Sequence, residues 1–305
     1  MANGIRVPAR SFKYHRPRGI VGCGVEEPAS LVEIAGIGGN HPITTVALTQ
    51  GLEAKAVNCW PHPAFDIGAA VQLFARLIPA GFYDITFMRP DWYFFEPSIR
   101  RAARLANAPD TPPSTGRFEA RHAHTDVLVI GAGPAGLAAA QSAGRDGRRV
   151  MPVDEAGGGI LPHRFDIADA PASDWRTKTL STLQQMPNVT HLQRATAWGY
   201  REHNLVTVAQ EHPDTPGIIA RSWRIRAAEV VQARGAIERA LVFPGNDRAG
   251  IMLASAVQTH VNRYAVAPGR RVPLFSNNDS ACGFTRGPSA CDCRNRQPCT
   301  CDECY

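Results

Sequence analysis

The sequence lacks the features that would place it in a membrane or in an export pathway. No uncharged apolar run reaches the roughly 18–20 residues that a membrane-spanning helix needs. The opening residues, MANGIRVPAR, contain no apolar core of a secretory signal. Hydrophobic residues still make up 44% of the 305-residue chain, which is enough to build a core. We therefore expect a soluble, cytoplasmic protein with no membrane partner.

Cysteine is nearly absent from most of the chain. Only Cys23 and Cys59 precede residue 282, whereas six more crowd residues 282–305. A secreted disulfide-bonded protein would spread its cysteines through the fold. The body of the chain therefore indicates a reducing compartment.

The charge excess is small: 33 Lys and Arg stand against 27 Asp and Glu, a net charge of +6. The densest basic cluster runs from Arg10 to Arg18, with Phe12 and Tyr14 between the charges. Such a cluster can contact phosphates or nucleic acid. No second basic stripe accompanies it, so we favour an ordinary basic loop and expect no nucleic-acid partner.

Common catalytic motifs are missing as well. The chain has no GxSxG elbow, no HExxH and no P-loop, and its ten histidines lack metal-ligand spacing. We therefore assign no catalytic residue and no metal site in the body of the chain.

The apolar pattern predicts two domains joined by a linker. The first part predicts short strands and two helices (Leu31–Ile34, Ile43–Leu48 and Leu52–Val57; Ala69–Ile78 and Phe94–Leu105). The stretch NAPDTPPSTG, residues 107–116, has no apolar periodicity and opens a linker that we place at residues 107–125.

After the linker the pattern becomes α/β, typical of a Rossmann-like domain. We place this domain at residues 126–281. It predicts alternating strands and helices (strands Asp126–Ile130, Arg149–Val153, Val189–Leu192, Leu205–Ala209, Trp223–Ala227, Glu229–Ala233 and Arg271–Phe275; helices Ala135–Ala143 and Ile251–Tyr264).

A glycine-rich turn follows the first strand of this domain. Gly131 permits the tight turn, Gly133 lets the backbone approach a pyrophosphate, and Gly136 lets the helix pack close to the sheet. The N-terminus of the following helix offers N–H groups to the phosphates. The candidate cofactor-binding residues here are Gly131, Ala132, Gly133, Pro134, Ala135 and Gly136.

Two acids end the second strand at the spacing of a ribose-binding carboxylate. They are Asp154 and Glu155. A carboxylate there favours a free ribose 2′-hydroxyl, hence NAD or the adenosine half of FAD, over NADP. The turn does not separate NAD from FAD. We interpret Arg148 and Arg149, just upstream, as charges at the edge of the strand.

Four separate stretches resemble the α subunit of heterotetrameric sarcosine oxidase. These are SFKYHRPRGIVGCGVEEPASLVEI (11–34), AGFYDITFMRPDWYFFEPSIRRAARLA (80–106), DVLVIGAGPAGLAAA (126–140) and GAIERALVFPGNDRAGIMLASAVQTHVNRYAVAPGRRVPLFSNNDSA (235–281). The resemblance runs in register over residues 2–281 and is therefore more specific than the glycine turn alone.

The resemblance implies a ferredoxin-like α+β domain that has lost its iron–sulfur cluster, here residues 1–106. An incomplete flavoprotein fold of the two-dinucleotide-domain type follows, binding NAD or FAD. It also implies oxidation of sarcosine to glycine by oxygen, with tetrahydrofolate accepting the one-carbon unit. The amine would react on a β subunit that carries covalent FMN, with γ and δ subunits completing the complex. The cysteine count agrees with cluster loss, since a [2Fe–2S] site needs four ligands. Cys23 is either a vestigial ligand or, as we favour, a small loop residue.

The chain departs from the family in three places. The family's opening strands are missing before the Ala2-Asn3-Gly4-Ile5 segment. The family's A-T-G is Ala233-Arg234-Gly235 here. Gly235 is a further candidate cofactor-binding residue, while Arg234 would either disturb the cofactor or reach a phosphate. The resemblance ends after Ala281, before any folate module.

The tail, residues 282–305, contains no Leu, Ile, Val or Met. Its clustered cysteines would suit a thiolate site for zinc or copper(I). We favour out-of-frame sequence instead, and expect the tail to be disordered.

Three functions stay open at this point. The first is one component of an oxidoreductase, inactive alone and acting on sarcosine, dimethylglycine or an opine. The second is a non-catalytic dinucleotide-binding module that serves assembly, and the third is a decayed gene product without a stable fold.

Overall fold

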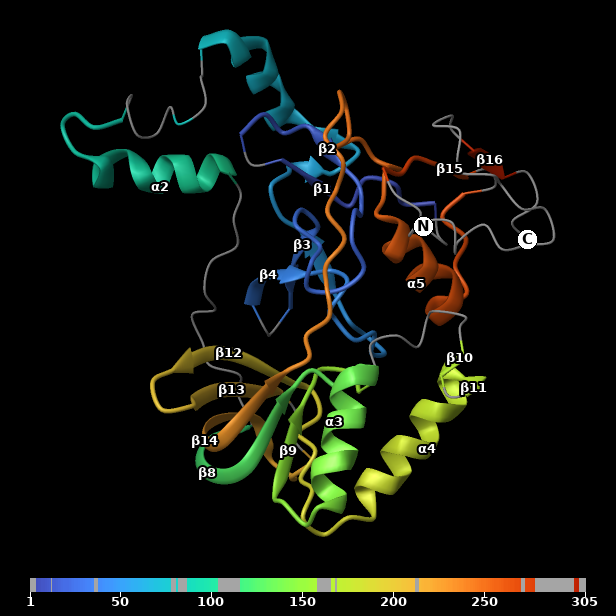
Figure 1. The fold of residues 1–305 in the computed structure, drawn as a ribbon. Coiled ribbons are helices and arrows are strands. Elements are labelled where there is room, and N and C mark those ends of the chain that lie inside the picture. Colours follow the sequence, from blue (N-terminus) through green and yellow to red (C-terminus); the bar gives the residue numbers. More distant parts are fainter. Residues whose placement is uncertain are drawn as a thin grey trace. The chain divides into compact units, whose positions relative to one another are not determined.

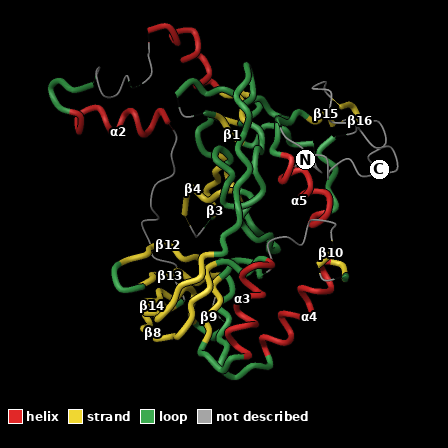
Figure 2. Tube along the Cα trace, viewed as in Figure 1, coloured by secondary structure: helices red, strands yellow, loops and turns green. Residues whose placement is uncertain are grey.

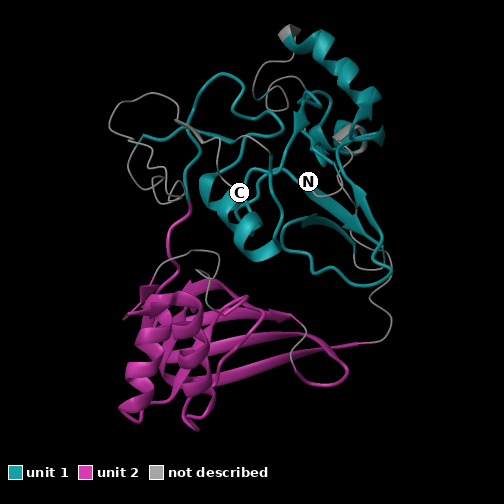
Figure 3. Cartoon of the chain, turned by 90° about the vertical axis from the view of Figure 1, so that its right-hand side faces the viewer, with its two compact units in different colours: residues 1–112, 238–305 teal, residues 113–237 magenta. Residues whose placement is uncertain are grey.

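The computed structural model describes residues 4–11, 13–35, 38–77, 81, 87–103, 116–157, 166–167, 169–211, 214–269, 272–277 and 299–301. The chain forms two compact units, residues 1–112 with 238–305, and residues 113–237 (Figure 3). These boundaries differ from the expected ones in two places. A strand already begins at Arg117, inside the predicted linker 107–125. Residues 238–281 belong to the first unit and not to the unit that carries the glycine turn.

The second unit is built on one five-stranded sheet (Figure 1). Its order is β12-β13-β14-β8-β9, with β14, β8 and β9 parallel and the other pairs antiparallel. The strands are β8 (Arg117–Ile130), β9 (Val150–Val153), β12 (Ala195–Arg201), β13 (Leu205–Glu211) and β14 (Ile218–Gln232). The helices are α3 (Pro134–Arg145) and α4 (Ala172–Gln184), and a small hairpin pairs β10 (Asp166–Ile167) with β11 (Ala170–Pro171).

Several sequence predictions for this unit change in detail. The two strands expected at Trp223–Ala227 and Glu229–Ala233 are one continuous strand, β14. The strand expected at Val189–Leu192 makes only two isolated bridges to β9. Helix α4 and strand β12 were not predicted. Helix α4 has the sequence ASDWRTKTLSTLQ and buries only Ala172, Thr179 and Leu183, so it shows little apolar periodicity.

The last residues of β8, from Val127 to Ile130, pack against other elements on both faces, which explains their continuous apolar run. Val127 and Val129 pack with Leu137 of α3 and Leu183 of α4 on one face. Leu128 packs on the other face with residues of β9, β13 and β14. The side-chain alternation of an extended strand directs neighbours to opposite faces, so a central parallel strand needs apolar residues at every position.

The first unit contains only short elements (Figure 2). Its sheets are the pair β1 (Ala9–Arg10) and β2 (Pro17–Arg18), the pair β6 (Pro61–His62) and β7 (Phe65–Asp66), the order β4 (Gly38–Pro42), β3 (Leu31–Ile34), β5 (Ala54–Ala56), and the pair β15 (Val272–Leu274) and β16 (Cys299–Cys301). Its helices are the 3-10 helix η1 (Ile67–Leu77), α2 (Trp92–Ala103) and α5 (Ala254–Tyr264). The strand expected at Ile43–Leu48 is a turn followed by irregular chain.

Buried polar contacts tie the short elements of the first unit together. Arg10 donates to the carbonyls of Pro63 (2.6 Å) and His15 (2.9 Å), and the His15 ring lies 2.6 Å from the Asp66 carboxylate. Asp66 also accepts the N–H groups of Trp60 (2.9 Å) and Gly68 (3.0 Å). Burying such polar side chains is costly unless they form hydrogen bonds. Arg10, His15 and Asp66 all form them here.

Most of the expected disordered tail lies outside the described residues. Its described part, Cys299–Cys301, forms β16 and pairs antiparallel with β15, where we expected no structure. Among the described helices, none has the length and apolar character required to cross a bilayer.

The core of the second unit gives a stability prediction. Leu128 has no exposed surface, so Leu128→Ala removes buried methyl groups and leaves a cavity, lowering the free energy of unfolding by about 2–5 kcal/mol. Phe118→Ala on the same strand is the matched control, because Phe118 is 65% exposed. Denaturant unfolding of the full chain measures both, and equal losses would contradict this account of the core.

Candidate functional site: a glycine-rich turn beside the end of β14

The turn between β8 and α3 packs directly against the end of β14. Gly131 has a φ of +96°, and a Cβ there would collide with the carbonyl oxygen of Ala233. A Cβ on Gly136 would collide with the Gly131 carbonyl oxygen. Both positions therefore require glycine, as the sequence analysis expected.

Gly133 differs from these two glycines. A Cβ added to it would meet no atom within 4 Å. It is the N-cap of α3, no side chain caps the helix, and Pro134 occupies its first turn. The N–H groups of this first turn have no acceptor within the helix and carry the positive end of the helix dipole. The backbone around Gly133 can therefore receive an anionic group such as a pyrophosphate.

The two acids after β9, Asp154 and Glu155, differ in their hydrogen-bond partners. The Asp154 carboxylate accepts the N–H of Ala132 (2.7 Å) with one oxygen, and those of Ala156 (2.8 Å) and Gly157 (2.6 Å) with the other. Asp154 therefore clamps the glycine turn to the loop after β9. The sequence grouped it with the ribose-binding candidates, but the contacts give it a structural role.

Glu155 is the acid that remains for a ligand. Its side chain is exposed, and its Oε1 accepts a hydrogen bond from the Thr196 hydroxyl of β12 (2.9 Å). This contact orients the carboxylate at the carboxyl ends of the parallel strands, where ligands of open α/β sheets bind.

The end of β14 completes the site. The Ala233 N–H donates to the Ile130 carbonyl (2.8 Å), so β14 stays paired with β8 up to the turn. Gly235 then has a φ of +69°, a conformation that favours glycine. The turn residues Gly131 to Gly136 are thus brought together with Ala233 and Arg234, which directly follow β14, although about a hundred residues separate them.

Arg148 and Arg149 take no part in this site. Arg149 lies 2.6 Å from Asp126, and Arg148 lies 2.9 Å from Glu229. Hydrogen bonds from Arg149 lower the pKa of Asp126 to about 2. Both arginines, which directly precede β9, therefore pair with acids of the neighbouring strands β8 and β14, in agreement with their interpretation as edge charges.

Sequence reasoning missed two contributors to the loop after β9. Arg176 of α4 donates to the Gly157 carbonyl (2.6 Å), and Thr196 orients Glu155. Neither residue belongs to a motif. Both lie on elements that the apolar pattern did not reveal.

Two family models match the chain. The model described as a pyridine nucleotide-disulphide oxidoreductase covers residues 125–269, and one described as a 2Fe-2S iron-sulfur cluster binding domain covers residues 1–59. The chain is 46% identical over 301 residues to the sarcosine oxidase α subunit of Rhizobium meliloti (strain 1021), and 35% identical over 300 residues to that of Corynebacterium sp. (strain U-96). This chain is a homologue of the sarcosine oxidase α subunits.

These matches cover 93% and 92% of the chain but only 30% and 26% of the relatives. The chain therefore spans less than a third of the α subunits that it matches. An opine oxidase subunit of Agrobacterium tumefaciens (strain Ach5) is 34% identical over 161 residues, covering 49% of the chain and 31% of that protein.

A solved structure shares the fold. L-proline dehydrogenase from P. horikoshii superposes with a TM-score of 0.55 at 17% sequence identity, covering 87% of this chain and 42% of that one. At this identity the likeness establishes the mixed α/β architecture and carries nothing about substrate.

The residues that the iron–sulfur model matches, 1–59, do not fit the cluster that it describes. Residues 1–125 contain two cysteines, Cys23 and Cys59, whereas a [2Fe–2S] cluster of this type takes four. Burial raises the pKa of the Cys23 thiol, which disfavours the thiolate that binds metal. Within the described residues, no three His, Cys, Asp or Glu side chains gather as metal ligands.

A carboxylate organises the loop around Cys23 instead. Glu27 is 3% exposed. One of its oxygens accepts the N–H groups of Val21 (2.7 Å) and Gly22 (2.8 Å), and the other accepts those of Ala29 (3.0 Å) and Ser30 (3.0 Å). Four backbone donors thus converge on one buried anion of the chain itself.

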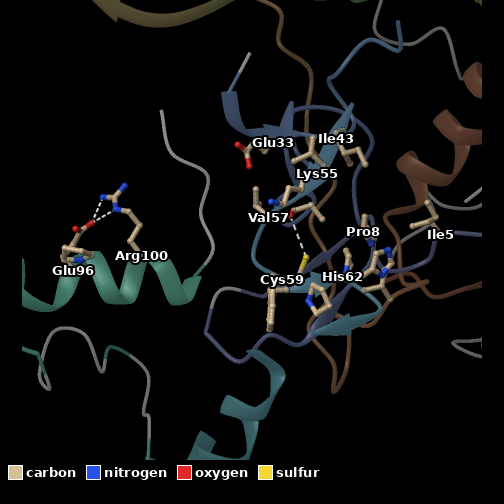
Figure 4. Close-up of a pocket in the computed structure, with 18 residues that line it drawn as sticks. Ile5, Pro8, Glu33, Ile43, Lys55, Val57, Cys59, His62, Glu96 and Arg100 are labelled. Carbon is tan, nitrogen blue, oxygen red and sulfur yellow. Dashed lines mark hydrogen bonds and ion pairs between the residues drawn. The ribbon is translucent and has the colours of Figure 1, made fainter. Parts of the chain in front are cut away.

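The first unit also has a hollow of about 800 Å³ (Figure 4). Buried Val32, Val57 and Cys59 lie in its wall. Its Glu96 and Arg100 pair with each other on α2, with Arg100 Nε 2.6 Å from Glu96 Oε1. The lining forms no acid–base or nucleophile constellation, so the glycine turn remains the candidate site.

The Glu27 carboxylate gives a second prediction. Glu27→Gln replaces one acceptor oxygen by an NH₂ group that faces two backbone N–H groups, so the free energy of unfolding should fall by about 1–3 kcal/mol. Glu33→Gln is the control, because Glu33 is exposed on β3. Thermal unfolding of the full chain compares the two variants. An unchanged melting temperature for Glu27→Gln would refute the role of this carboxylate.

Proposed function

We propose that this chain is the dinucleotide-binding part of an amine-oxidising flavoenzyme of the sarcosine oxidase type. The observation that carries the proposal is the open backbone at Gly133, at the uncapped start of α3, between two glycines that close packing requires. The homology to sarcosine oxidase α subunits supports the reaction class. Residues 1–106 would form a ferredoxin-like domain without a cluster.

The proposed ligand is an adenine dinucleotide, NAD or FAD. Its pyrophosphate would lie against Gly133, Ala135 and Gly136, and Glu155 would accept a hydrogen bond from the ribose 2′-hydroxyl. A 2′-phosphate would meet the negative charge of Glu155, which disfavours NADP. The bound dinucleotide would supply redox chemistry, while the residues of this chain bind and orient it.

The proposed partners are the other subunits of such an enzyme. Sarcosine would be oxidised on a β subunit that carries FMN, with γ and δ subunits in the assembled complex and tetrahydrofolate as the one-carbon acceptor. The matches to opine oxidase make an opine the second candidate amine. They cover about half of the chain, whereas the sarcosine oxidase matches cover nine tenths of it. A dinucleotide-binding module without catalysis is the other alternative.

The glycine turn predicts a binding defect. Gly133→Val places a branched side chain where the pyrophosphate would lie, so binding of NAD and FAD measured by calorimetry should be lost. Ala138→Val is the matched control, because it adds the same side chain at an exposed position of α3. Both variants should keep the fold, as judged by their melting curves. Equal affinities for the two variants would contradict the assignment of this turn.

The division of labour between subunits predicts the activity of the isolated chain. No described constellation supplies a base for amine oxidation, so the chain with added FAD and FMN should not consume oxygen when sarcosine is supplied. Addition of a β subunit of the same enzyme type should restore oxygen uptake. Turnover by the chain alone, well above the blank, would place the chemistry on this chain and refute the proposed arrangement.

A further inference from the structure

We propose that Arg234 is a phosphate ligand of the dinucleotide, adding a full positive charge to the backbone cradle of the glycine turn. The inference rests on the proposed function and deepens it, because it assigns a charged contact to the same site. It identifies the phosphates of the shared ADP half, and not the nicotinamide or flavin ring, as the group that this side chain recognises.

The backbone places Arg234 at the turn. Its Cα would lie 3.3 Å from a Cβ on Gly131, and the neighbouring Ala233 Cβ would lie 3.3 Å from one on Gly136. Arg234 therefore follows directly on the residue that packs against both structural glycines. Its side chain is exposed, and an arginine side chain is long enough to extend from this position over the start of α3.

The charge of Arg234 is not committed to an acid within the described part of the chain. Three other arginines of this unit are engaged: Arg148 and Arg149 pair with Glu229 and Asp126, and Arg176 donates to the loop after β9. No salt bridge joins Arg234 to a described carboxylate, and Asp154 is saturated by backbone N–H groups. The Arg234 guanidinium therefore lies beside the glycine turn without an acid partner among the described residues. Its fork of N–H donors suits a phosphate group.

The backbone N–H groups of the turn and the Arg234 side chain would bind a phosphate in different ways. Backbone N–H groups at Ala135 and Gly136 supply directional hydrogen bonds and a fixed partial charge. Arg234 would supply a mobile unit charge at the rim, which dissolved salt screens. Removing the Arg234 charge should therefore weaken the binding of phosphorylated ligands, most strongly at low salt. The binding of a neutral nucleoside should be unaffected.

The experiment uses the full chain with calorimetric titration of NAD, FAD and ADP, and adenosine as the uncharged probe, each at low and high salt. Arg234→Gln should weaken NAD, FAD and ADP alike by about three- to tenfold at low salt. The affinity that Arg234→Gln loses should be smaller at high salt. Its affinity for adenosine should equal that of the unmodified chain. Arg234→Lys should restore most of the affinity and its salt dependence.

The control is Arg224→Gln. Arg224 is exposed on the same strand, ten residues earlier, and so roughly 33 Å from Arg234 along the strand. It should change neither affinity nor salt dependence. Melting curves check that each variant is folded.

The outcomes separate this inference from the proposed function. Unchanged or tighter binding of ADP by Arg234→Gln, or an equal loss for adenosine, overturns the role of Arg234 while Gly133→Val still abolishes binding. If the unmodified chain binds neither NAD, FAD nor ADP, the proposed function fails and the Arg234 contact fails with it.

Discussion

The close approach of three backbone segments governs the second unit. The end of β8, the start of α3 and the end of β14 lie so near one another that Gly131 and Gly136 have no room for a side chain. The Asp154 carboxylate closes the assembly by bonding the N–H groups of the turn and of the loop after β9. Everything that makes the turn a candidate anion site, including the exposed first turn of α3, follows from this packing.

Neighbouring residues with the same charge acquire different roles because of where the backbone directs them. Both oxygens of Asp154 accept backbone N–H groups and hold the turn in place. The Glu155 carboxylate is exposed and accepts a hydrogen bond from the Thr196 hydroxyl. The same contrast separates Arg148 and Arg149, which pair with Glu229 and Asp126, from Arg234, which makes no salt bridge to a described carboxylate.

Buried polar contacts join the short strands of the first unit. Its strands are two to five residues long, and the Arg10–His15–Asp66 contacts and the Glu27 carboxylate join segments that the sheets do not. Removing one partner of such a contact leaves a buried group unsatisfied, which costs more than the contact itself contributes. The Glu27 carboxylate holds the loop around Cys23 through four backbone N–H groups.

The sequence by itself determined the glycine turn, the strand before it, the helix after it and the following strand, because local steric needs and a buried apolar run are written in consecutive residues. It also predicted the similarity to sarcosine oxidase α subunits, through four long matching segments. The tertiary structure decided what depends on distant residues: that β14 continues through two predicted strands, that α4 and β12 exist, and that residues 238–281 join the first unit. It likewise separated Asp154 from Glu155 and placed Arg234 beside Gly131. Contacts between residues that are tens of positions or more apart leave no pattern in the local sequence.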